Sequence, residues 1–178
     1  MSSPVYWIAT VGTSPCAVVN TLWRTVAERS CVPSHVALLH SPSDDYVRNR
    51  ALPACVEAID ILAEAYAIPS PRVAMGEATQ FDESRPETFL AAVLSCVRQA
   101  NQRKLPVVID ITAGRKYMSA VLMIVGIKLK GRVQAIYYNH LKGRQYEQTP
   151  FALVPRPEHQ LRDMTDLFRQ VTPEERRA

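Results

Sequence analysis

Continuous apolar runs alternate with amphipathic segments along this chain, and this alternation constrains the fold more than any other feature. Residues 5–11 are β-branched and aromatic, and residues 107–111 are apolar except for Asp110. Apolar runs of this kind are typical of strands buried on both faces, and the helical spacing between them predicts helices that cover those faces. The sequence therefore predicts an α/β, Rossmann-like three-layer sandwich with a mostly parallel six-stranded sheet.

The same patterns predict where each element lies. We expect Ser84 to cap a helix that has Pro86 in its first turn and Glu87 in a capping box. One domain of residues 1–178 is expected, with a core over about 4–155 and a C-terminal helix within about 157–171. Strands are expected at residues 5–11, 36–39, 72–75, 107–111, 133–138 and 151–154, the last antiparallel to its neighbour.

Composition excludes several classes of protein. With 47% hydrophobic and 21% charged residues, the 178-residue chain is neither disordered nor collagen-like. No apolar run approaches the roughly 20 residues that cross a bilayer, and no secretory signal is visible, so a cytoplasmic protein is expected. Neither a CxxC pair nor zinc-site spacing occurs, so we expect buried free thiols, no metal and no cofactor. The four cysteines are Cys16, Cys31, Cys55 and Cys96.

Positive charge is concentrated in the second half of the chain. Residues 1–100 carry 7 basic and 10 acidic side chains, whereas residues 101–178 carry 14 basic and 7 acidic ones. This asymmetry indicates an anionic partner such as a nucleic acid, although a solvated basic face would give the same count.

Two loops are predicted to meet at one edge of the sheet. In a doubly wound sheet with strand order 3-2-1-4-5, ligands bind where the order reverses, between the first and fourth strands. Each of these strands ends in glycine and hydroxyl residues that lead into a helix, whose free N–H groups attract anions. The candidate residues are Gly12, Thr13, Ser14, Pro15, Thr112, Ala113, Gly114, Arg115, Lys116 and Met118, with Asp110 and His140 beside them.

Other interpretations of these residues stay open. The glycines can simply allow tight turns, with the hydroxyl side chains capping helices. Asp110 can be a catalytic carboxylate or the cap of a turn, and His140 can be an acid–base group or a surface residue. Neither loop has the spacing of a dinucleotide-binding or Walker motif.

The two loops, in this order, resemble motifs of the CRISPR-associated Rossmann-fold family, called CARF. Residues 11–15 (Val-Gly-Thr-Ser-Pro), followed by a Val-rich helix, resemble the first motif. Residues 110–119 (Asp-Ile-Thr-Ala-Gly-Arg-Lys-Tyr-Met-Ser) resemble the second. The resemblance covers roughly residues 4–155.

This resemblance implies a homodimer that binds a cyclic oligoadenylate, tetra-adenylate more than hexa-adenylate. A stand-alone member of this size is similar to ring nucleases, which cleave the messenger and switch off type III CRISPR signalling. Cleavage without metal would give a 2′,3′-cyclic phosphate, with Thr13 or Ser14 orienting the 2′-hydroxyl and Arg115 and Lys116 holding the phosphate. A sensor that binds without cleaving and regulates a partner protein is the alternative, and an unrelated mononucleotide enzyme is a remoter one. Direct DNA binding and membrane association are not expected.

Overall fold

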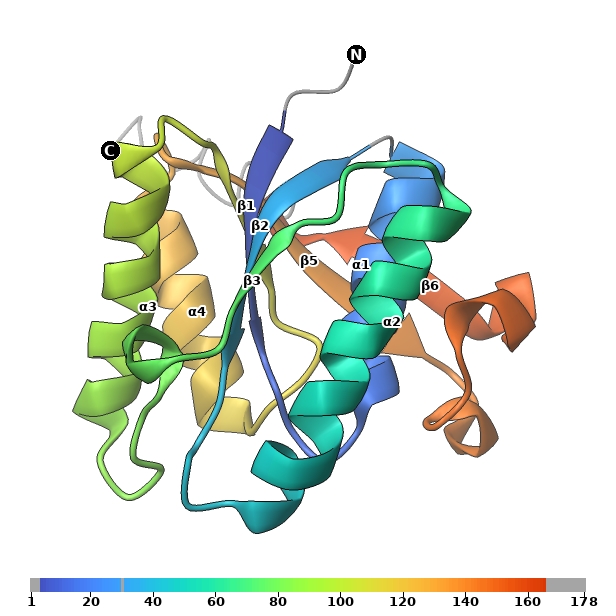
Figure 1. Ribbon diagram of the computed structural model, residues 1–178, viewed down its shortest axis with the longest axis horizontal. Helices are drawn as coiled ribbons and strands as arrows, with labels where there is room; N and C mark the ends of the chain where they lie inside the picture. The colour runs from blue at the N-terminus through green and yellow to red at the C-terminus, as the bar shows by residue number, and fades with distance from the viewer. Residues whose placement is uncertain (1–3, 30, 166–178) are drawn as a thin grey trace, which may run out of the picture.

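In residues 4–29 and 31–165, which the computed structural model describes, six strands form one sheet in the order β3-β2-β1-β4-β5-β6 (Figure 1). Neighbouring strands are parallel except β5 and β6, which are antiparallel. The predicted fold class is therefore confirmed. The strands are β1 (Pro4–Thr10), β2 (Val32–Leu39), β3 (Arg72–Ala74), β4 (Val107–Asp110), β5 (Val133–Leu141) and β6 (His159–Asp163).

Helices cover both faces of this sheet. In Figure 1, α1 and α2 lie on one side of the strands, and α3 and α4 lie on the other. Side chains alternate accordingly along β1: Trp7 packs in the core beneath α1 and α2, whereas Ile8 packs beneath α3 and α4. Burying each large apolar side chain contributes roughly 1.5–3 kcal/mol. The longer helices are α1 (Pro15–Arg29), α2 (Leu52–Ala65), α3 (Pro86–Gln102) and α4 (Lys116–Lys128).

The first residue of α3 is predicted correctly, but the residue that caps the helix is not. Pro86 is the first helical residue, as expected, but Arg85 occupies the cap position and makes no side-chain cap hydrogen bond. Ser84 instead donates its hydroxyl to Asp82 Oδ1 at 2.7 Å. The capping box fails because Asp82, two residues earlier, binds the serine hydroxyl within the preceding turn.

The C-terminal part departs from the expected positions. Residues 151–153 form a short 3₁₀ turn, and the strand antiparallel to β5 is β6. The predicted strand at residues 151–154 is therefore wrong in place, although the antiparallel partner exists. The expected helix within about 157–171 is wrong over residues 157–163, and residues 166–171 lie outside the described part.

No helix of the described residues is long and apolar enough to cross a membrane.

The four cysteines differ in how deeply they are buried. The cysteines are free thiols, but only Cys55 and Cys96 are fully buried, while Cys16 and Cys31 are half-buried. Burial raises the pKa of the Cys55 thiol to about 12, so this thiol stays protonated and unreactive.

Candidate functional site

The two predicted loops meet at the carboxyl ends of β1 and β4. These strands are parallel neighbours, and Ala9 lies opposite Asp110. A Cβ atom added at Gly12 would lie 3.7 Å from the backbone nitrogen of Gly114, so the loop backbones are in near contact. The strand order reverses at this position, as expected, because β2 lies on one side of β1 and β4 on the other.

Gly114 allows this close approach. Its φ of +94° is in the region that favours glycine, and an added Cβ would lie 2.6 Å from Thr10 Oγ1 and 3.1 Å from Met118 Sδ. The Thr10 hydroxyl in turn donates to the Ala113 carbonyl oxygen at 2.6 Å. The last residue of β1 therefore holds the loop that follows β4.

Thr112 joins three elements beneath the loops. Its backbone N–H donates to Asp110 Oδ1 at 2.8 Å. Its hydroxyl oxygen accepts from the Asn139 N–H in β5 at 2.9 Å and from the Thr21 hydroxyl in α1 at 3.0 Å. A threonine predicted as a ligand contact or helix cap is thus also a structural connection between α1, β4 and β5.

Asp110 lies below the surface rather than in the ligand space. It is 1% exposed, and burial raises the pKa of its carboxyl to about 7, although hydrogen bonds from Thr112 oppose the shift. Its Oδ2 and the nearby Asn139 Oδ1 are buried without hydrogen-bond partners among the described residues. A neutral carboxyl suits this position better than a carboxylate, because burial disfavours the charged form. Asp110 therefore positions Thr112 and does not itself line the cavity.

The loop after β1 is held by a segment distant in sequence. The Ser14 hydroxyl donates to the Glu147 carbonyl oxygen at 2.9 Å. The Asn20 side chain donates to the Thr149 carbonyl oxygen and accepts from the Phe151 N–H, both at 2.8 Å. We name residues 147–151 the α1 strap. Nothing in the local sequence pattern predicts it, because its hydrogen bonds span about 130 residues.

A cavity of about 340 Å³ opens between the two loops. Eight of the twelve predicted site residues line it: Gly12, Thr13, Ser14, Thr112, Ala113, Gly114, Arg115 and Met118. Pro15, Asp110, Lys116 and His140 do not line it. The lining also contains residues that were not predicted from the sequence: Val11, Ala17, Ser41, Asp44, Val47 and Glu83.

The missed polar residues come from β2 and β3. Ser41 and Asp44 follow β2, and Glu83 follows β3, so all three lie at the same edge of the sheet as the two loops. The signal was present in the sequence, because carboxyl ends of parallel strands share one edge. The prediction considered only the ends of the first and fourth strands and therefore found eight of the fourteen lining residues.

Charges of both signs meet in the cavity. The Arg115 guanidinium contacts Glu83 Oε2 at 2.7 Å, and this contact raises the pKa of Arg115, to which the charge of Asp44 also contributes. Arg115 is exposed and Glu83 is half-buried, and solvent screens a pair of this kind, so an anionic ligand can displace Glu83. Lys116 is exposed at the first position of α4 and forms no ion pair within the described residues.

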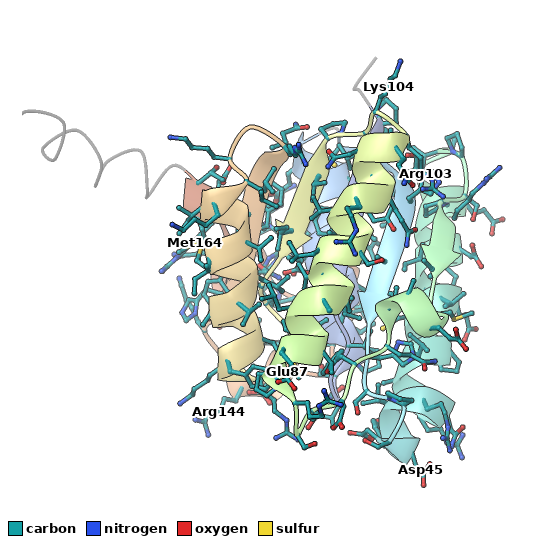
Figure 2. All side chains as sticks on the ribbon, turned by 90° about the vertical axis from the view of Figure 1, so that its left-hand side faces the viewer. Asp45, Glu87, Arg103, Lys104, Arg144 and Met164 are labelled. Atoms are coloured by element: carbon teal, nitrogen blue, oxygen red, sulfur yellow. The ribbon has the colours of Figure 1, made fainter. Side chains whose placement is uncertain are left out.

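The basic residues of the second half do not form one patch. Figure 2 shows Arg144 and Glu87 at one end of the molecule and Arg103 and Lys104 at the opposite end. Helix α3 begins beside the site at Pro86, so Arg103 and Lys104 lie far from it. Only part of the positive charge counted in the sequence can therefore act on a ligand in the cavity.

His140 lies within β5 rather than just past it. Strand β5 runs to Leu141, and His140 pairs with Gln160 of β6. Its ring centroid is 6.1 Å from that of Tyr138, while Tyr137 is buried on the other face and stacks on Trp7 at 6.0 Å. Within residues 4–29 and 31–165, no cluster of His, Cys, Asp or Glu could hold a metal ion.

Comparison with solved structures identifies the fold. No protein-family model and no curated protein matches the chain. Csm6 from Enterococcus italicus, bound to cyclic hexa-2′-fluoro-hexa-dAMP, superposes with a TM-score of 0.59 at 8% identity, covering 96% of this chain and 45% of that one. This chain has the fold of the matched part of Csm6. The Rossmann-like fold expected from the resemblance to CARF domains is therefore confirmed.

Two other solved structures give weaker superpositions. Can2 from Sulfobacillus thermosulfidooxidans, in complex with cyclic tetra-adenylate, matches with a TM-score of 0.43 at 11% identity over 75% of this chain and 31% of that one. MurG from Acinetobacter baumannii matches with a TM-score of 0.29 at 15% identity over 75% and 40%. The chain spans less than half the length of each of these proteins.

Replacing Gly114 by alanine tests the close approach of the loops. We expect Gly114→Ala to lower the free energy of unfolding by about 1–3 kcal/mol, because alanine at this φ is strained and its Cβ meets Thr10. Gly131→Ala is the control, since nothing lies within 4 Å of its added Cβ and its φ is ordinary. Urea denaturation measures both. Equal stabilities of the two variants would contradict this account of the loop.

The buried carboxyl of Asp110 predicts a pH dependence of stability. Its pKa is about 7 in the folded protein and about 3.9 in an unfolded chain, so the folded state binds the proton more tightly. The contribution of this protonated carboxyl to the free energy of unfolding is fully present below about pH 4 and is lost as the pH rises through 7. Asp110→Asn keeps an acceptor for Thr112 and removes the titration. Between pH 5 and 6.5 we expect the free energy of unfolding of the wild type to fall relative to that of this variant by about 1.4 kcal/mol per pH unit. Urea denaturation measures both, and the same pH dependence in the two proteins would refute the role of Asp110.

Proposed function

We propose that the protein binds a cyclic oligoadenylate in this cavity and cleaves it as a metal-independent ring nuclease of type III CRISPR signalling. The observation that carries the proposal is the meeting of residues 12–14 and 112–115 around one cavity beside the start of α4. The fold shared with Csm6, whose structure holds a cyclic hexanucleotide analogue, supports the same class of ligand. We propose tetra-adenylate ahead of hexa-adenylate, as the resemblance of the two loops to CARF motifs implies.

The donors for a phosphate lie on one side of the cavity. Backbone N–H groups at Gly114 and at the start of α4 would be available to an anion. Arg115 adds positive charge within the lining, and Lys116 adds it next to the cavity, at the first position of α4. Arg115 would release Glu83 and bind the phosphate in its place. These groups stabilise the negative charge that develops on the phosphate oxygens during in-line attack.

The hydroxyl groups of the first loop would align the sugar. The Ser14 hydroxyl donates its hydrogen bond to the Glu147 carbonyl oxygen, so Oγ can still accept one from a ribose hydroxyl. Thr13 is exposed beside it. The ribose 2′-oxygen attacks its own 3′-phosphate, the phosphorus–O5′ bond breaks, and the 2′-proton passes to the 5′-oxygen. The products are a 2′,3′-cyclic phosphate and a 5′-hydroxyl, and the reaction consumes no water and requires no metal ion.

A two-fold homodimer would suit a ring-shaped ligand. One chain offers one pair of loops, which can contact only part of a ring, whereas two copies would surround it symmetrically. Ile124 and Ile127 on α4 are 57% and 39% exposed and provide apolar surface that a second copy can cover. Ile124 lies eight residues, or about two turns, beyond Lys116 on the same helix. A dimer formed through this part of α4 would bring together two copies of the helix that begins at the site.

A second candidate is a sensor that binds the ring without cleaving it and regulates a partner protein. The observation that favours it is the Arg115–Glu83 pair, which leaves Lys116 as the cation at the site without an acidic partner among the described residues. Binding would then displace Glu83, but the positive charge next to the phosphate would be too small to support cleavage.

Incubation with labelled cyclic tetra- and hexa-adenylate tests the proposed activity. We expect linear products ending in a 2′,3′-cyclic phosphate, formed at the same rate with excess chelator. Binding without any product would favour the sensor. Activity that chelator abolishes and magnesium or manganese restores would reject the mechanism, and failure to bind either ring would reject the proposed function.

Three substitutions separate binding from catalysis. We expect Lys116→Ala to weaken binding and to slow single-turnover cleavage, each by about tenfold, because its charge contacts phosphate in both the ground and transition states. Thr13→Ala and Ser14→Ala should slow cleavage more than they weaken binding, since alignment matters chiefly in the transition state. Lys130→Ala is the matched control, an exposed lysine just beyond the far end of α4. Wild-type cleavage rates in all three site variants would place the reaction elsewhere.

A further inference from the structure

Beyond the phosphate side, the cavity has a second side with different chemistry. Asp44 and Ser41 come from the turn after β2, and Val47 comes from the π-helical turn (Val47–Ala51) that precedes α2. Ala17 of α1 adds another apolar surface to the lining. An apolar wall next to a carboxylate is unsuited to a phosphate, which is charged on all sides. It suits a nucleobase, which has apolar faces and a polar edge.

The two oxygens of Asp44 have different surroundings. Oδ1 accepts from the Val47 backbone N–H at 3.0 Å and so caps the turn that begins there. The carboxylate forms no other hydrogen bond or ion pair within residues 4–29 and 31–165, so Oδ2 remains an acceptor for a ligand. An aspartate carboxylate accepts hydrogen bonds and donates none. It therefore recognises an N–H group at the edge of a base and is unfavourable beside a carbonyl oxygen.

The charges in the cavity orient a nucleotide. Gly114 and the start of α4 lie on the β4 side, whereas Asp44 follows β2 on the other side of β1. The Arg115 side chain extends from the β4 side to Glu83, which follows β3. Asp44 contributes to the raised pKa of Arg115, so its negative charge acts within the same space. A nucleotide with its phosphate at Gly114 and Arg115 directs its base toward Asp44, and the opposite orientation brings phosphate against a carboxylate.

We infer that Asp44 is a specificity-determining residue that accepts a hydrogen bond from the exocyclic amino group of adenine. This inference rests on the proposed function and adds how the site distinguishes adenine from a base with oxygen at the same position. Hypoxanthine, the base of inosine, is such a base: it replaces the 6-amino group of adenine by a carbonyl oxygen. Its oxygen would face Asp44 Oδ2, and two acceptors would meet without a proton between them.

The experiment compares cyclic tetra- and hexa-adenylate with the corresponding cyclic inosinates. Asp44→Asn is the informative variant, because its side-chain oxygen can still cap Val47 while its NH₂ group replaces Oδ2 with a donor. Asp45→Asn is the matched control. Asp45 is the adjacent carboxylate, pairs with Arg48 and does not line the cavity, and Figure 2 shows it at the outer edge of the molecule.

We expect wild type and Asp45→Asn to bind the adenylate ring at least tenfold more tightly than the inosinate ring in titration calorimetry. In Asp44→Asn the ratio should fall by at least tenfold, because the new donor pairs with the inosine carbonyl. Asp44→Ser, which can also cap the turn but is too short to reach the base, should bind both rings within about threefold of each other. Unfolding midpoints measured in urea confirm that each variant is folded.

The outcomes separate this inference from the proposed function. If wild type binds neither adenylate ring, the proposed function fails. If wild type binds adenylate but the adenylate-to-inosinate ratio is the same in Asp44→Asn and Asp45→Asn, the role of Asp44 is wrong and the function stands. Equal binding of the two rings by wild type would also overturn the role of Asp44.

Discussion

The close contact between the loops after β1 and β4 is the constraint on which the site depends. The contact requires a residue without Cβ at Gly114, because any side chain there would collide with Thr10 Oγ1. The same threonine hydroxyl holds the Ala113 carbonyl oxygen, so β1 fixes the loop of its neighbour. Thr112 then connects that loop to α1 and β5. The backbone of this part of the lining is thus fixed before any ligand binds, so the proposed binding of an anion there would require little reorganisation.

Side chains of both charges line the cavity, which the net charge of the chain does not reveal. The formal charge is +4, yet the lining contains two carboxylates and one guanidinium. A site for free phosphate would gain nothing from Asp44 and Glu83. A nucleotide combines a charged phosphate with a base that carries neutral donors, and a lining of mixed sign matches both parts. Arg103 and Lys104 lie at the other end of the molecule, where they affect solubility and long-range attraction and cannot contact a ligand in the cavity (Figure 2).

The sequence predicted the sheet and the two loops because both depend on local patterns. Apolar runs defined β1 and β4, and glycine with hydroxyl residues marked the turns after them. The sequence did not predict β6 or the α1 strap, because both depend on partners far along the chain. Residues 151–154 have the apolar composition of a strand, but Asn20 binds the backbone there, and the short turn ends before Pro155. Asp44 and Glu83 were missed for another reason: a polar residue after a weak strand gives no periodic signal, and only the three-dimensional arrangement brings it to the cavity.

The α1 strap makes completion of the first loop depend on a late part of the chain. The Asn20 amide contacts Thr149 and Phe151 through hydrogen bonds that resemble those of a strand partner. During synthesis, residues 12–20 leave the ribosome more than 120 residues before the strap does. The growing chain can form β1, β2 and α1 early, while Ser14 still lacks Glu147 and its hydroxyl is free to rotate. The loop after β1 is therefore complete only when β5 has paired with β4 and the α1 strap has bound α1. A nascent chain that is already partly folded would still lack this part of the proposed site.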